Sequence, residues 1–178
     1  MRLRFKNIIP SLFLTLILLL ILEIISSTLL PVFGFINYRI PFNVLILLYI
    51  GFKLETPWIA LLVLAVQYLH SFFSNEGWAL GTFTGTTICV IVSYVRELIH
   101  FNTVFATILI TQIFQTVWFL IVSGMIYIQV SNSNLLIEKF WRFLPESLFI
   151  SFISPAFYIL LDRIWKSDQS ETFGEGVL

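Results

Sequence analysis

The stretch from Ile8 to Leu30 reads IIPSLFLTLILLLILEIISSTLL, and it decides the class of fold to which this chain belongs. A helix needs about 20 apolar residues to cross a bilayer, and this stretch contains a single charged residue, Glu23. Arg2, Arg4 and Lys6 precede it, as in a secretory signal. However, the run exceeds the about 7–15 residues of a cleavable signal, and no small-x-small pattern follows. We therefore predict a retained first membrane helix.

The composition supports a membrane protein. Of the 178 residues, 58% are hydrophobic and 11% are charged, and the mean hydropathy is +0.96. A soluble domain carries about a quarter charged residues. The formal net charge of zero argues against a nucleic-acid partner. A single cysteine, Cys89, excludes an intramolecular disulfide, and the sequence predicts neither a metal site nor a cofactor.

Further apolar segments predict an all-α polytopic membrane helix bundle with about six transmembrane helices and short loops. After the first segment, they lie at about 40–54, 57–73, 79–95, 103–130 and 144–165. Residues 1–166 would form a single membrane domain, and the polar residues 167–178 a disordered cytoplasmic tail. Residues 131–143 are polar and then amphipathic, which predicts a short helix in the outer interface.

The second segment, Ile40 to Leu54, is the shortest, at about 22 Å for 1.5 Å per residue. It is either a short span or a re-entrant piece. If it crosses and the N-terminus is cytoplasmic, three of the ten basic residues, Arg39, Lys139 and Arg142, lie outside and seven inside. If it turns back, the division is five to five. The positive-inside rule therefore favours six spans with both termini cytoplasmic.

Two sets of polar residues interrupt the apolar segments. Gln67, His70 and Ser71 share one face of the third segment, and Gln112 and Gln115 lie on the fifth. Together they form either a polar pocket for a small ligand or interhelical hydrogen bonds, which average about 0.6 kcal/mol each.

The acidic residue of the first segment needs an account of its own. An isolated carboxylate in hydrocarbon is costly. Glu23 is therefore protonated, paired across helices, or close enough to the outer boundary to reach water.

Gly77, Gly81 and Gly85 recur every four residues and form a small-residue ridge. Such a ridge allows close approach of another helix. It serves packing inside the bundle or an interface with a partner. Arg96 and Glu97 follow at the predicted cytoplasmic end, as ordinary helix-end charges or as contacts for a cytoplasmic partner.

Searches for catalytic motifs find no nucleophile elbow, no zinc-protease helix and no phosphate-binding glycine loop. The histidines, His70 and His100, fall on opposite sides of the predicted membrane. We predict that the chain is not an enzyme. An enzyme acting on lipids is the weakest alternative, because the sequence supplies no nucleophile–base pair.

The last apolar segment reads LPESL at 144–148 and SPAFYILLDR at 154–163. This pattern resembles the C-terminal helix of the rod shape-determining protein MreD family. A basic N-terminus, a second segment led by Pro41, and Leu80-Gly81 match the family's order of elements. One departure is the sequence QYLHS at 67–71, where the family often has Gly-Leu-Leu-x-Asp. The acidic residue of that motif is missing here.

The resemblance implies a non-enzymatic scaffold subunit of the bacterial cell-elongation complex, which makes peptidoglycan in rod-shaped cells. It would reside in the inner membrane with MreC-like, MreB-like and RodA/transpeptidase-like partners. The alternative is the substrate-binding membrane subunit of an energy-coupling-factor vitamin transporter. In that case Gln67, His70, Trp78 and Gln115 would line an external pocket.

Overall fold

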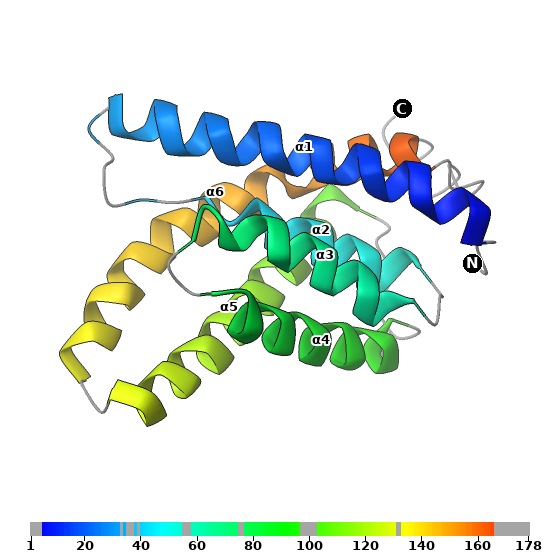
Figure 1. Cartoon of the computed structure of the whole chain (residues 1–178). Coiled ribbons are helices and arrows are strands. Elements are labelled where there is room, and N and C mark those ends of the chain that lie inside the picture. Colours follow the sequence, from blue (N-terminus) through cyan, green and yellow to red (C-terminus); the bar gives the residue numbers. More distant parts are fainter. Residues whose placement is uncertain are drawn as a thin grey trace.

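Six α-helices make up the computed structural model, which describes residues 5–32, 34, 38, 40–54, 58–74, 77–96, 103–130 and 133–165 (Figure 1). The helices are α1 (Phe5–Val32), α2 (Phe42–Lys53), α3 (Ile59–Ser71), α4 (Trp78–Val95), α5 (Val104–Val130) and α6 (Ser133–Trp165). Each predicted apolar segment corresponds to one helix, so the all-α prediction is confirmed.

Four of the helices, α1, α4, α5 and α6, are long and apolar enough to cross a membrane. The other two are shorter: α2 has 12 residues and α3 has 13. At 1.5 Å per residue they measure about 18 and 20 Å, which is less than the about 30 Å of the hydrocarbon core. The four long apolar helices therefore indicate that the chain is a multi-pass membrane protein.

The short helix α2 is the centre of the bundle and packs against each of the other five helices. Every residue from Phe42 to Gly51 is buried. A helix that is apolar on all sides is stable only where it is surrounded and shielded from water. In α2, the surrounding elements are the other helices of the protein. The segment from Ile40 to Leu54, which the sequence allows to be either a short span or a re-entrant piece, thus forms the core of the fold.

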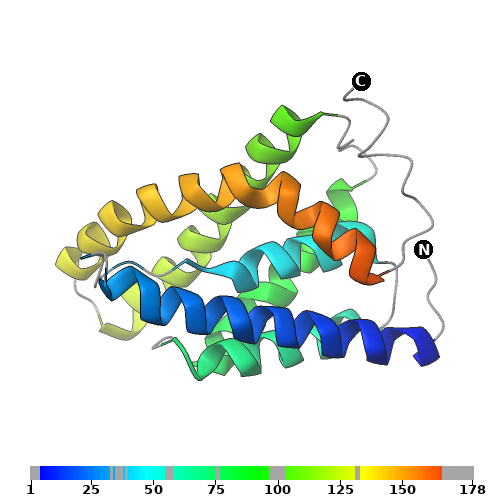
Figure 2. The ribbon, with the colours of Figure 1, turned by 90° about the horizontal axis from the view of Figure 1, so that it is seen from above.

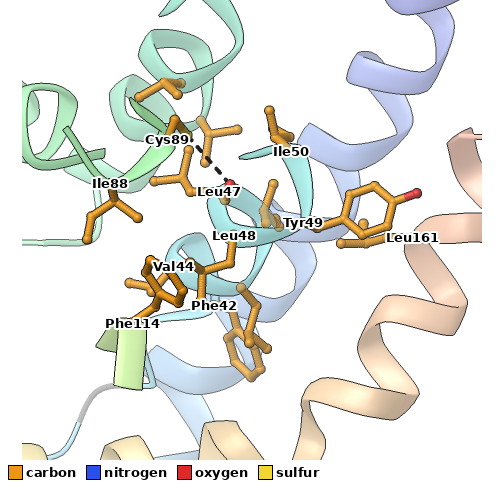
Figure 3. Close-up of a cluster of buried hydrophobic side chains, with 14 of the residues drawn as sticks. Phe42, Val44, Leu47, Leu48, Tyr49, Ile50, Ile88, Cys89, Phe114 and Leu161 are labelled. Atoms are coloured by element: carbon orange, nitrogen blue, oxygen red, sulfur yellow. Dashed lines mark hydrogen bonds between the residues drawn. The ribbon is translucent and has the colours of Figure 1, made fainter. Parts of the chain in front are cut away.

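Close packing around α2 depends on small residues and on one unusual hydrogen bond (Figure 3). The Cys89 thiol of α4 donates to the Leu47 carbonyl across 3.7 Å. Gly51 faces Val92, and a Cβ atom at Gly51 would lie 3.2 Å from the Val92 Cγ1 atom. These contacts bring α4 directly against the backbone of α2.

The structure corrects the prediction for residues 131–143. Instead of a separate interfacial helix followed by a span over 144–165, residues Ser133–Trp165 form the single helix α6 of 33 residues. Pro145 and Pro155 lie inside it. A proline removes one backbone hydrogen bond and bends a helix without necessarily ending it, and Figure 2 shows α6 changing direction along its length. Pro145 therefore does not begin a new helix.

The beginning of α1 and the end of α6 are held together. The Ser11 hydroxyl donates to the Ile164 carbonyl across 3.1 Å, and the Trp165 indole N–H donates to Thr15 Oγ1 across 3.1 Å. We call this end of the bundle the terminal end, and the opposite end, where α1 and α3 finish, the distal end (Figure 2). Residues 166–178 lie outside the described residues, so the disordered tail stays a prediction.

Candidate functional site

A cavity of about 290 Å³ lies at the distal end of the bundle. Residues of α1, α2, α3, α5 and α6 line it, together with residues just before α2 and just after α3. Its polar lining includes Glu23, His70 and Gln115. Residues from distant parts of the sequence thus meet around one hollow.

One wall of the cavity is a pair between α1 and α3. The His70 Nδ1 atom lies 2.6 Å from the Glu23 Oε1 atom, within hydrogen-bond distance. Both groups are largely shielded, with 17% and 7% of their side-chain surfaces exposed. Glu23 is therefore paired across helices, which is one of the three alternatives that its position in the sequence allows.

The wall formed by α5 contains two buried polar atoms that stand out, Gln115 Oε1 and Ser123 Oγ. Gln115 is 2% exposed and Ser123 is 8% exposed, and both line the cavity. Among the described residues, neither Gln115 Oε1 nor Ser123 Oγ has a hydrogen-bond partner. Buried polar groups in folded proteins are almost always hydrogen-bonded, so these two atoms are exceptions.

The amide nitrogen of Gln115 is fixed by a network between α5 and α6. It donates to Ser151 Oγ across 3.3 Å, and the Ser151 hydroxyl donates to Gln112 Oε1 across 2.8 Å. Gln112 Nε2 in turn donates to Ser147 Oγ across 3.1 Å. Because its nitrogen is held on the α6 side, the Gln115 side chain has a defined orientation.

Aromatic rings form the apolar part of the lining. Phe119 of α5 stacks on Phe143 of α6, with ring centroids 4.5 Å apart and an interplanar angle of 21°. Trp118 and Val122 continue this surface along α5. The cavity therefore combines a flat apolar wall with several polar groups.

The first half of α6 brings charged residues to the cavity. Lys139, Arg142 and Glu146 line it, at spacings of three and four residues that share one helical face. Arg142 also pairs with Glu138, one turn earlier on the same helix. The sequence places Lys139 and Arg142 in a separate interfacial helix and Glu146 at the beginning of the next span. The predicted pocket therefore does not include these three residues.

The predicted polar pocket is only partly assembled at this cavity. His70 and Gln115 line it, whereas Gln67, Ser71 and Gln112 do not. Gln67 Oε1 accepts from Asn43 Nδ2 of α2 across 3.4 Å, and the Ser71 hydroxyl donates to the Tyr68 carbonyl across 2.6 Å.

Gln112 belongs to the network between α5 and α6 described above. Trp78, the further candidate for an external pocket, is about half exposed and does not line the cavity either.

Two of the three ridge glycines pack inside the bundle. A Cβ atom at Gly81 would collide with the Gln67 amide, and one at Gly85 would lie 2.9 Å from Val63 Cγ1 and 3.0 Å from Leu47 Cδ1. Gly77 differs, because nothing lies within 4 Å of its Cβ position and its φ angle is +74°. It makes the turn into α4, a conformation that side-chain-bearing residues rarely adopt.

Of the two remaining predicted site residues, the structure describes one, at the other end of α4. Arg96 follows the last turn of α4 and is half-buried. Glu97 lies outside the described residues. Within the described part of the chain, no cluster of three or more His, Cys, Asp or Glu residues can hold a metal ion.

Some lining residues gave no signal in the sequence. Trp118 and Ser123 lie in an apolar run, where an aromatic or a small hydroxyl residue is ordinary.

Comparisons with protein-family models, with curated proteins and with solved structures find no match to this chain.

Proposed function

We propose that this chain is a non-enzymatic membrane scaffold subunit of the bacterial cell-elongation complex. The resemblance to MreD rests mainly on residues 144–148 and 154–163 of α6. Asp162, near the end of that pattern, accepts a hydrogen bond from Tyr49 Oη across 2.9 Å and lies 3.6 Å from Lys53 Nζ. This three-residue cluster joins α6 to the central helix, and it is the observation that carries the proposal.

The position of the pattern fits a scaffold better than a catalyst. Ser154, Tyr158 and Leu161 are buried, so the pattern contributes to helix packing. A protein whose work is to present helix faces to partners needs a rigid bundle and large apolar outer surfaces. Such surfaces are found on α4 and α5, where Tyr94 and Phe105 are 80% and 73% exposed. Lipid or the helices of partner proteins would cover them.

For the membrane arrangement we propose six spans with both termini in the cytoplasm of a bacterial cell. The terminal end then faces the cytoplasm and the distal end faces outward. Although α2 is short, it is enclosed by protein and need not match the bilayer thickness. The partners that fit this arrangement are MreC-like, MreB-like and RodA/transpeptidase-like proteins, together with membrane lipid.

Depletion of the protein in its native bacterium tests this proposal. We expect rod-shaped cells to become spheres and the rod shape to return when the wild-type gene is expressed. An Asp162→Leu variant should fail to restore it, because the hydrogen bond with Tyr49 and the ion pair with Lys53 are lost. Arg163→Gln is the matched control on the exposed neighbour, and it should restore the shape. Depleted cells that stay rod-shaped would contradict the scaffold function.

A second candidate function is the substrate-binding membrane subunit of an energy-coupling-factor vitamin transporter. The cavity with its Glu23–His70 wall favours it, because such a subunit must hold a small molecule. Thermal unfolding of the purified protein with a panel of water-soluble vitamins separates the two. A vitamin that raises the midpoint by several degrees at micromolar concentration would support the transporter subunit, and no shift with any vitamin would count against it.

A further inference from the structure

We propose that the distal cavity binds a small, uncharged, flat aromatic molecule that carries a hydrogen-bond donor, such as a ring N–H, at its edge. The inference goes beyond the scaffold function and does not rest on it. Binding by the purified protein and the shape of depleted cells are separate measurements, so either proposal can fail while the other stands.

The first argument is the hydrogen-bond network that fixes the amide of Gln115, followed here from its far end. The Ser147 hydroxyl donates to the Leu144 carbonyl across 3.0 Å, so Ser147 Oγ accepts from Gln112 Nε2. The oxygen of the Gln112 amide therefore faces Ser151 and accepts from its hydroxyl. Because Ser151 has one side-chain proton to donate, its Oγ atom accepts from Gln115 Nε2.

This order of donors leaves the carbonyl oxygen of Gln115 as an acceptor at the cavity. Gln115 lines the cavity and is 2% exposed, and its Oε1 atom has no hydrogen-bond partner among the described residues. An amide oxygen only accepts hydrogen bonds. A molecule that completes this site must therefore present an N–H or O–H group to Gln115 Oε1.

The second argument is that the charged residues of the lining already have partners. Glu23 of α1 lies 2.6 Å from His70, and Arg142 of α6 pairs with Glu138. The other two charged lining residues have interactions as well: Lys139 and Glu146. A charged ligand would lose its hydration without gaining an unpaired opposite charge from these side chains, which is costly. The ligand that fits is therefore uncharged.

The third argument is the aromatic surface beside Gln115. Phe119 follows Gln115 by four residues on one face of α5, which is about 6 Å at 1.5 Å per residue. Its ring stacks on Phe143 of α6, and Trp118 also lines the cavity. Because the acceptor and the rings are one helical turn apart, a flat molecule reaches both only if its donor lies at its own edge. Burial of its rings against this surface contributes hydrophobic binding energy.

The volume sets the size of the ligand. The cavity measures about 290 Å³. An apolar cavity of about 150 Å³ can hold benzene, so the distal cavity has room for two fused rings. A phospholipid with two acyl chains does not fit such a space. We therefore assign the site to a small molecule and not to a membrane lipid.

The experiment uses the full-length protein in phosphatidylcholine nanodiscs and two probes of the same shape. Indole carries a ring N–H, whereas benzofuran has an oxygen in its place and no donor. Equilibrium dialysis, with empty nanodiscs as the reference, separates binding to the protein from partition into lipid. We expect saturable binding of indole and a rise in thermal midpoint with its concentration. Benzofuran should bind about tenfold more weakly, because it leaves the buried acceptor without a partner.

Three further probes test whether the site requires an uncharged ligand. Indole-3-carboxylate is an anion and 3-(aminomethyl)indole is a cation, and we expect each to bind at least about tenfold more weakly than indole. The neutral 3-ethylindole is the control for the added size. It should bind more tightly than both charged probes.

A substitution at Gln115 identifies the partner of the donor. Gln115→Met keeps the length of the side chain and removes the amide. Indole binding should fall about tenfold, to the level of benzofuran, while benzofuran binding stays as in the wild type. Gln67→Met is the matched control, because Gln67 is also 2% exposed, bonds Asn43 of α2 and does not line the cavity. It should prefer indole to benzofuran as the wild type does, and circular dichroism checks that both variants are folded.

A second substitution tests the aromatic wall independently of the amide. Phe143→Leu removes one of the two stacked rings on the α6 side. We expect it to weaken the binding of indole and of benzofuran by a similar factor, about threefold to tenfold. If Gln115→Met does not fold, this variant and the comparison of probes on the wild type still decide the proposal.

Four outcomes would overturn the proposal. One is that indole fails to bind, or binds no more tightly than benzofuran. Another is that either charged probe binds as tightly as indole. The third is that folded Gln115→Met keeps the preference for indole, or that folded Gln67→Met loses it. The last is that Phe143→Leu leaves the binding of both neutral probes unchanged.

Discussion

His70 of α3 and Glu23 of α1 lie within hydrogen-bond distance at the distal end, with 2.6 Å between His70 Nδ1 and Glu23 Oε1. The two residues are far apart in the sequence, and each is a rare polar group in an apolar helix. Their pairing explains how the bundle tolerates a carboxyl group with 7% of its surface exposed. It also makes both residues sensitive to substitution.

We expect Glu23→Leu to lower the free energy of unfolding by about 1–3 kcal/mol, because it leaves the His70 ring shielded without its partner. Glu23→Gln retains an oxygen acceptor and should cost less. Unfolding in mixed micelles with rising dodecyl sulfate, followed by circular dichroism, measures the difference. Ser27→Ala, on an exposed face of the same helix, is the control and should change little. Equal losses for Glu23→Leu and Ser27→Ala would show that the pair does not stabilise the bundle.

A methyl group at Gly85 should lower the free energy of unfolding by about 1–3 kcal/mol, because overpacking a tight core strains its neighbours. The new Cβ atom would lie 2.9 Å from Val63 and 3.0 Å from Leu47. Gly124→Ala is the matched control, since nothing lies within 4 Å of its Cβ position on α5. That control should be neutral or stabilising by up to about 1 kcal/mol, because alanine favours the helix. The same micelle titration compares the two variants, and similar losses would contradict the packing.

Tyr49→Phe removes the hydroxyl that donates to Asp162 across 2.9 Å. A hydrogen bond to a charged group contributes about 1.5–3 kcal/mol, and we expect a loss of this size in the free energy of unfolding. Tyr94→Phe on the outer face of α4, which is 80% exposed, should cost nothing measurable. If Tyr49→Phe unfolds at the wild-type midpoint, the cluster at the terminal end does not hold α6 to α2.

Single cysteines test the six-span arrangement in a Cys89→Ser background. Trp58→Cys, after α2, should react only with a membrane-permeant maleimide in intact spheroplasts. Ser74→Cys, after α3, should react with an impermeant one. The reason is that α2 and α3 would each cross the membrane, which places Trp58 on the cytoplasmic side and Ser74 on the outer side. Labelling of Trp58→Cys from outside would show that α2 turns back.

The existence and type of the helices could be predicted from hydropathy alone, because each apolar segment avoids water in the same way. Hydropathy cannot distinguish burial in lipid from burial in protein, however. Ile40 to Leu54 and Ile8 to Leu30 look alike in this respect. Only the structure shows that the first is enclosed by five helices, while many residues of the second face outward.

Polar residues stand out against an apolar background, and two that the sequence singles out for this reason, His70 and Gln115, line the cavity. The cavity also depends on Lys139, Arg142 and Phe143, which were assigned to a separate interfacial segment. The last predicted span begins at about residue 144, and the local pattern does not reveal that α6 continues through Pro145. The partner of Glu23 was equally hidden, because sequence spacing says nothing about which helices become neighbours.

The central position of α2 also sets constraints on how the protein is made. α2 leaves the ribosome well before α5 and α6, which supply aromatic rings around it: Phe52 meets Phe114 with ring centroids 5.3 Å apart, and Phe42 meets Phe157 at 6.2 Å. Until those helices are synthesised, lipid or the insertion machinery must cover the apolar surface of α2. The core closes only when the last helix is inserted, and a nascent chain that stalls before this point presents an unfinished centre to quality-control proteases.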